Sequence, residues 1–151
     1  MSTNLFSPDL TLRPPRSPRL RLGGFVILPR ALDKGRAKLA GRIGEYHFNC
    51  PLDKRFLSFV KIEGDALLAE LAAGKGDGEI LAWIFENAGH KPFPWEITQW
   101  SAFQESLGPD TVQAKERFAR QLAEQAPDRG DILTGFDRLD LDDYLTFGGK
   151  A

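Results

Sequence analysis

The feature that most constrains the fold is a succession of helical hydrophobic patterns that runs from about residue 29 to the C-terminus. Apolar residues recur every three or four positions within each pattern, and glycine or proline separates one pattern from the next. No segment shows a convincing strand pattern. The sequence therefore predicts an all-α fold: a single compact helical domain of six or seven helices, with at most a short extended segment at 44–48. The expected helices cover residues 29–42, 51–62, 64–74, 77–90, 94–108, 110–126 and a last stretch that starts near 131.

Residues 1–23 differ from the rest because they hold four of the ten prolines and no helical period. The centre of this segment reads "LRPPRSPRLRLGG", and each residue that precedes a proline is pushed toward extended backbone. We expect an extended, Pro- and Arg-rich N-terminal arm over 1–23 and a helical domain over 24–151.

The charge of the chain is divided unevenly between its two parts. Residues 1–62 carry 12 basic and 4 acidic side chains, whereas residues 63–151 carry 8 and 17, although the formal net charge is only −1. Such an asymmetry is typical of an anion-binding half. It is equally explained by two oppositely charged segments that pack on each other.

The arm places four arginines close together on a stiff backbone, with no acidic residue between positions 10 and 31. Guanidinium groups in this arrangement can bind phosphate or carboxylate groups, so we predict an anionic small molecule or a protein as the partner. The alternative is that the arginines lie along the acidic residues at 137–143. The acidic isoelectric point of about 6.1 argues against nucleic acid. The candidate ligand-binding residues are Arg13, Arg16, Arg19, Arg21, Lys34, Arg36, Tyr46, His90 and Trp95.

The stretch "GEYHFNCPLDKRF" brings four chemically capable residues together: His47, Asn49, Asp53 and the only cysteine, Cys50. One interpretation is a helix start, with Asn49 or Cys50 as N-cap, Pro51 in the first turn and Asp53 near the positive end of the helix dipole. The other is a small reactive site, in which a thiol at a helix N-terminus has a histidine three residues away. These four are the candidate catalytic residues.

Sequence signatures of common enzymes are absent. The chain has no C-x-x-C, H-E-x-x-H, G-x-S-x-G or P-loop motif. The glycine-rich "GKGDG" at 74–78 lacks the dinucleotide spacing and is interpreted as a turn between helices. Two histidines and one cysteine offer too few ligands for a zinc site. We therefore expect neither a metal nor a cofactor.

Six aromatic residues lie between positions 83 and 103. Clusters of this kind usually fill a core, because each ring buries a large apolar area. We expect these rings to contribute to the core, with His90 at the mouth of an adjacent pocket. The six are Trp83, Phe85, Phe93, Trp95, Trp100 and Phe103.

The sequence also carries signals of location. The longest apolar runs are much shorter than the ~20 residues that span a membrane, and the first residues do not resemble a secretory signal. A single cysteine forms no internal disulfide, which fits a reducing compartment. We expect a cytoplasmic protein that does not enter the membrane.

Four long segments resemble a bacterial family catalogued as domain of unknown function 5069. They are "RPPRSPRLRLGGFVILPRALDKGRAKLAG", "GEYHFNCPLDKRFLSF", "GKGDGEILAW" and "FDRLDLDDYLTFGG". The likeness runs from about residue 10 to 149 and implies a compact bacterial single-domain protein. It implies no activity and no catalytic residue.

Two functions remain open on the sequence alone. The first is a non-catalytic domain that binds a small molecule or a protein through its basic half. The second is a small enzyme or redox-responsive protein centred on Cys50 and His47. The ligand and the oligomeric state are left open by the sequence.

Overall fold

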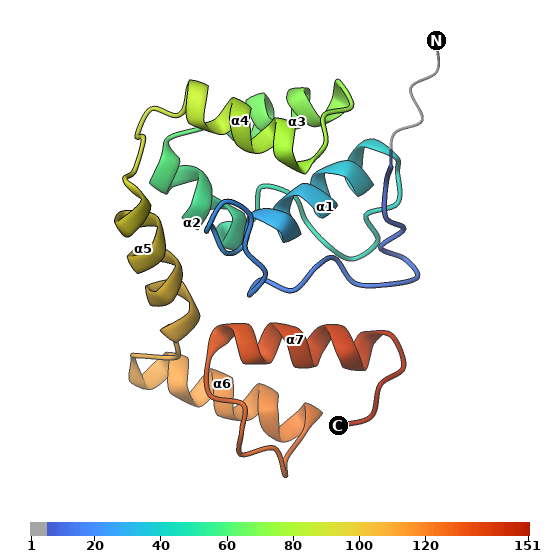
Figure 1. The fold of residues 1–151 in the computed structure, drawn as a ribbon. Helices are drawn as coiled ribbons and strands as arrows, with labels where there is room; N and C mark the ends of the chain where they lie inside the picture. The colour runs from blue at the N-terminus through green and yellow to red at the C-terminus, as the bar shows by residue number, and fades with distance from the viewer. Residues whose placement is uncertain (1–5) are drawn as a thin grey trace.

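The computed structural model describes residues 6–151, and this part of the chain forms seven helices and no strand (Figure 1). The predicted all-α fold is confirmed. The short extended segment expected at 44–48 forms no strand, and residues 44, 45 and 48 lie in turns. The helices are α1 (Leu28–Leu39), α2 (Pro51–Val60), α3 (Gly64–Ala72), α4 (Asp77–Asn87), α5 (Pro94–Ser106), α6 (Val112–Gln125) and α7 (Gly135–Thr146).

Helix α1 ends three residues before the predicted boundary at 42. Gly41 takes a positive φ of 69°, which glycine adopts without steric cost. The amide of Arg42 then turns back and donates to the carbonyl of Ala37 at 2.8 Å. The glycine that ends α1 is therefore Gly41. Gly44, the other glycine near the predicted end of this helix, also has a positive φ but lies in the following loop.

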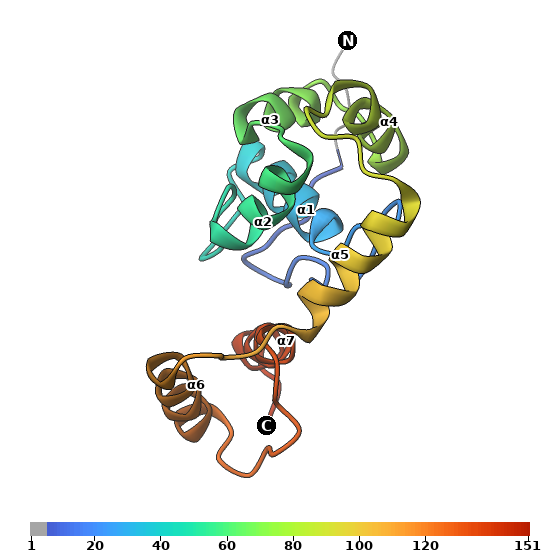
Figure 2. The ribbon, with the colours of Figure 1, turned by 90° about the vertical axis from the view of Figure 1, so that its left-hand side faces the viewer.

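The core forms around the chain that enters α1. The run from Phe25 to Leu28 is completely buried, and the ring of Phe25 meets that of Phe56 edge-on at 5.1 Å. Helices α2, α3, α4 and α5 surround α1 in both ribbon views (Figures 1 and 2). Other members of this core are Leu32, Val60, Leu67, Leu71, Ile80, Ile84, Ile97 and Phe136.

Helices α6 and α7 pack against each other as a second, smaller unit below this core (Figures 1 and 2). Their contact is made by Ala126, Ile132 and Leu141, with Phe118 and Leu122 beside them. Within the described residues, α6 has no fully buried side chain. The segment that precedes α1 runs between α1 and α7 (Figure 1), so it joins the two units.

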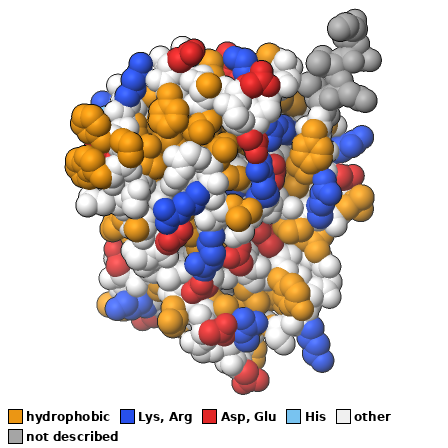
Figure 3. Space-filling view, in the orientation of Figure 1, with side chains coloured by type: hydrophobic (Ala, Val, Ile, Leu, Met, Phe, Trp, Pro, Cys, Tyr) orange, Lys and Arg blue, Asp and Glu red, His pale blue; other side chains and the backbone are white. Residues whose placement is uncertain are grey.

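The expectation that the aromatic residues between 83 and 103 fill the core is wrong for four of the six. Helix α5 buries Ile97, Ser101 and Gln104. Trp100 packs against the core as expected, whereas Phe103 is exposed. Ser101 is buried because its hydroxyl donates to the carbonyl of Gly24 at 2.6 Å and accepts from the amide of Val26 at 3.2 Å. The burial of Ser101 turns Phe103 toward solvent. Figure 3 shows hydrophobic side chains gathered at the left of the view. The exposed rings are Phe85, Phe93, Trp95 and Phe103.

Candidate functional site

A cavity of about 730 Å³ opens between the N-terminal segment, the C-terminal half of α1 and the turn that joins α3 to α4. Its volume lies within the range of pockets that hold small organic ligands. Most of its wall is apolar. The lining residues that carry the chemistry are the cations Arg13, Arg16, Arg36 and Lys75 and the carboxylates Asp33 and Asp77.

A network of ion pairs forms one wall of this cavity. The guanidinium of Arg16 donates to Asp33 Oδ1 at 3.0 Å and to Asp77 Oδ2 at 2.7 Å. The guanidinium of Arg36 donates to Asp77 Oδ1 at 2.9 Å and lies 4.0 Å from Asp33. Because Asp33 and Arg36 are largely buried, these groups are held in one geometry.

This network fixes the charge of its members. Burial raises the pKa of Asp77, but the hydrogen bonds from Arg16 and Arg36 outweigh burial, so the pKa lies below its usual value. Burial lowers the pKa of Arg16, but the bonds to Asp77 and Asp33 outweigh it and raise the pKa. Both groups are therefore charged at neutral pH.

Close packing of α1 on α3 brings the turn into place. Gly35 lies where the two helices touch, and a Cβ at this position would be 2.5 Å from Leu71 Cδ1. The turn itself needs Gly74, which has a φ of 88°. Helix α4 then begins at Asp77, whose carboxylate lies near the positive end of the helix dipole. The turn is also tied to α1 by Arg36, which donates to the carbonyl of Lys75 at 3.2 Å.

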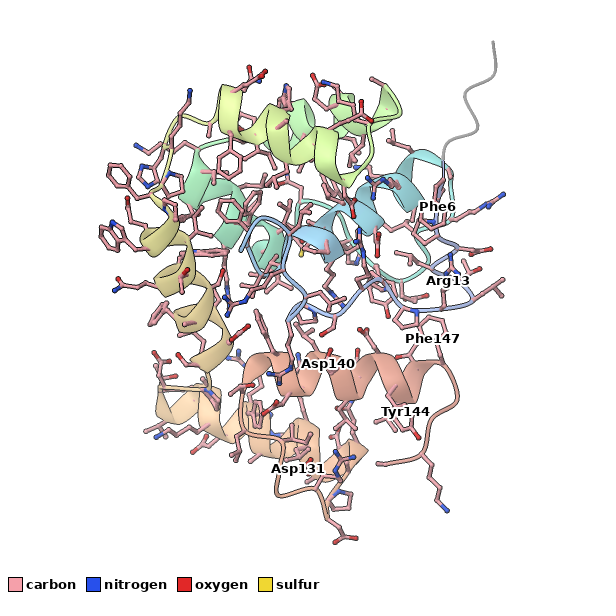
Figure 4. The ribbon with its side chains drawn as sticks, viewed as in Figure 1. Phe6, Arg13, Asp131, Asp140, Tyr144 and Phe147 are labelled. Atoms are coloured by element: carbon pink, nitrogen blue, oxygen red, sulfur yellow. The ribbon has the colours of Figure 1, made fainter. Side chains whose placement is uncertain are left out.

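Arg13 is the cavity arginine that makes no salt bridge among residues 6–151, although it lies close enough to the exposed Asp9 for an electrostatic interaction. It is exposed, and Figure 4 shows it with Phe6 at one edge of the molecule, below the C-terminal end of α1. The chain around it is anchored, because Ser7 donates to the carbonyl of Arg36 at 3.1 Å and the amide of Leu10 to that of Arg42 at 2.9 Å. The guanidinium of Arg13, which we call uncommitted because it makes no salt bridge among the described residues, is therefore carried by an anchored segment.

The predicted candidates around Cys50 lie outside this cavity. Cys50 is the N-cap of α2, without a side-chain capping bond, and Asp53 accepts instead from the amide of Asn49 at 2.9 Å. The half-buried sulfur of Cys50 lies 3.2 Å from Nζ of Lys34, and this Nζ lies 2.8 Å from Oδ1 of Asp53. His47 is exposed, and within the described chain it makes no hydrogen bond with Cys50. The partner of the sulfur is therefore the buried Lys34.

Other predicted ligand-binding residues pair with carboxylates of the C-terminal half. Arg19 contacts Asp137 and Asp140, and Arg21 donates to Glu105 at 3.1 Å. The hydroxyl of Tyr46 donates to Asp143 at 2.7 Å. Burial and this bond raise the pKa of Tyr46 above its usual value.

Two predicted ligand-binding residues, His90 and Trp95, lie near the exposed aromatic face, which consists of the exposed rings Phe85, Phe93, Trp95 and Phe103. The ring of His90 stacks on Phe59 at 5.5 Å, and its Nε2 lies 3.6 Å from Glu96. Trp95 is 61% exposed. Neither residue lines the cavity.

The sequence did not single out Asp77 or the "GKGDG" turn as parts of a site. The predicted turn between helices is present. It also lines the cavity, through Gly74, Lys75, Gly76 and Asp77. The sequence did contain a signal for a binding site here. Gly74 and Gly76 have no side chains and leave space for a ligand, and Asp77 places a carboxylate in the first turn of a helix. No cluster of metal-binding geometry occurs within the described residues.

The fold and the cavity define a small all-α domain with a ligand-sized, cation-lined pocket. The sequence profile described as Domain of unknown function (DUF5069) matches residues 12–145, and the chain belongs to this family. No curated protein matches the chain. In the part of the chain that the structure describes, no helix has the length and apolar character to cross a membrane.

Proposed function

We propose that the protein is a non-catalytic binding domain that holds a small anionic ligand in the cavity between the N-terminal segment, α1 and the α3–α4 turn. The observation that carries this proposal is the uncommitted guanidinium of Arg13 at the edge of a cavity of about 730 Å³. A guanidinium can bind a carboxylate or phosphate through two parallel hydrogen bonds.

The charge balance of the wall supports an anion. Four cationic side chains line the cavity against two carboxylates. The two carboxylates are bonded to Arg16 and Arg36, and Lys75 pairs with Glu70. The cationic excess therefore rests mainly on Arg13, which lies beside an apolar wall.

The proposal concentrates on Arg13 among the four arginines of the arm. Arg19 and Arg21 are ion-paired with α7 and α5, outside the cavity. Arg16 lines the cavity and positions Asp33 and Asp77. An anion that reached Arg19 or Arg21 would have to displace a carboxylate of the chain itself.

The experiment is a thermal-shift titration with inorganic phosphate, benzoate and octanoate. The variants are the wild type, Arg13→Gln and a matched control, Arg120→Gln, which removes an exposed arginine of α6. Binding to the folded state raises Tm, so we expect at least one anion to raise Tm in the wild type and in Arg120→Gln but not in Arg13→Gln. Equal shifts in all three proteins, or none in any, would contradict the proposal.

A redox-responsive Cys50 is the second candidate function, and the contact between its sulfur and Lys34 favours it. A neighbouring ammonium group stabilises the thiolate, which is the reactive form of cysteine. We expect the native protein to react with iodoacetamide faster than Lys34→Gln, after both are shown to be folded. A thiol that reacts only after denaturation would exclude this function.

A further inference from the structure

We infer that the ligand of the cavity is an amphiphile with one anionic head group and an apolar body, of the class of medium-chain carboxylates. This inference rests on the proposed function and names the chemical class that the cavity selects. The head group binds Arg13, and the body lies along the apolar wall that the N-terminal segment, α1 and α3 supply.

A single negative charge follows from the arrangement of the carboxylates. Asp33 and Asp77 both line the cavity, and both accept hydrogen bonds from Arg16. A second negative group beside this network would find no free counter-charge, because Arg16 and Arg36 are already bonded to the two carboxylates. One anionic group at Arg13, with an uncharged remainder, therefore matches the charges of the wall.

An apolar body follows from the side chains of the wall. Among residues 6–151, the hydroxyl of Ser7 is the one neutral polar side chain that lines the cavity, and it already donates to the carbonyl of Arg36. In the same part of the chain, no Asn, Gln, Tyr or His side chain lines the cavity to bind the edges of a base or the hydroxyls of a sugar. The apolar lining residues are Phe6, Pro8, Pro14, Leu39, Ala40 and Leu71.

Two of these apolar side chains are exposed to solvent. Leu39 is 43% exposed and Phe6 is 68% exposed. An alkyl chain that covered them would remove apolar surface from water, which is favourable in proportion to the area. Leu39 lies in the last turn of α1, and Arg36 lies one turn earlier, within the ion-pair network.

Calorimetric titration of hexanoate, heptanoate and octanoate, each below its micelle concentration, tests the inference. Burial of a methylene is worth about 0.8 kcal/mol, so each added methylene should tighten binding by about two- to fourfold. Octanol, which lacks the charge, should bind the wild type more weakly than octanoate does. Arg13→Gln should remove this difference, and Leu39→Gln should reduce the gain per methylene.

The controls separate the inference from the proposed function. If phosphate binds in an Arg13-dependent way and chain length has no effect, the amphiphile is refuted while the anion site stands. If no anion binding depends on Arg13, both fail. If Trp95→Ser abolishes octanoate binding and Arg13→Gln does not, the chain binds the exposed aromatic face, and the inference is overturned.

Discussion

Replacement of Asp143 by Asn should destabilise the protein strongly, because it leaves a buried arginine without its counter-charge. The side chains of Arg30 and Asp143 are only 4% and 8% exposed. Arg30 donates twice to the carboxylate, at 2.8 and 3.3 Å, and Tyr46 donates once at 2.7 Å. The pair links α1 to α7, so it also attaches the smaller helical unit to the core.

The magnitude follows from the burial of the pair. Removal of one partner of a buried ion pair typically costs about 3–5 kcal/mol, because the remaining charge is desolvated and uncompensated. Asn keeps the shape and accepts one bond, so we expect about 3 kcal/mol for Asp143→Asn. Tyr46→Phe removes one hydrogen bond to a charged group and should cost about 1.5 kcal/mol.

Urea unfolding followed by circular dichroism measures these differences. The double variant Arg30→Met, Asp143→Leu should recover most of the stability, because apolar residues of similar volume often replace a buried pair without loss. The reasoning is refuted if Asp143→Asn unfolds within 1 kcal/mol of the wild type, or if the double variant is as unstable as the single one.

Four further predictions concern other parts of the molecule. The folded protein lowers the pKa of Asp77, so the ion pairs of Asp77 stabilise the fold above its unfolded pKa, and this stability is lost as the pH falls through the folded pKa. Asp77→Asn should therefore lower the free energy of unfolding in urea at pH 7 and have little effect on it near pH 2. Equal losses at the two pH values would contradict this. Gly35→Ala should cost about 1–3 kcal/mol in the same assay, since its Cβ overlaps the α3 side chain packed on it, and a gain in stability would disprove the close contact. Lys34→Met should cost about 3–5 kcal/mol because its carboxylate partner is fully buried; no loss would show that this pair is not formed. Trp95→Ser should change stability by less than about 0.5 kcal/mol because the ring is exposed, and a large loss in thermal unfolding would place the ring in the core.

The helices could be predicted from the sequence because local signals set them. Pro51 and Pro94 begin helices in the first turn, and Gly41 ends one. The face that each helix buries was harder to predict. Ser101 and Gln104 occupy buried positions of α5, and a hydrophobicity pattern does not assign polar residues to a core. Their burial depends on hydrogen bonds from distant residues, such as the bond of Ser101 to Gly24.

The candidate site was predicted in its parts but not as an assembly. The arginines of the arm were recognised by their density, and opposite charge in the C-terminal half was weighed as their partner. Arg19 does pair with Asp137 and Asp140. Arg16 instead pairs with Asp33 and with Asp77, which is 61 positions away at the start of α4. Contacts at such separation depend on the packing of α1 on α3, which no local pattern encodes. That Lys34 and not His47 contacts the sulfur of Cys50 was not predicted for the same reason.

The most direct test of the cavity as a binding site is to map amide chemical shifts in a ¹⁵N-labelled sample titrated with octanoate. The account predicts saturable shifts in the segments 6–16, 33–40 and 71–77, which contain the residues that line the cavity. It also predicts that these shifts vanish in Arg13→Gln and persist in Arg120→Gln. Shifts confined to α4 and α5, or the same map in Arg13→Gln, would contradict it.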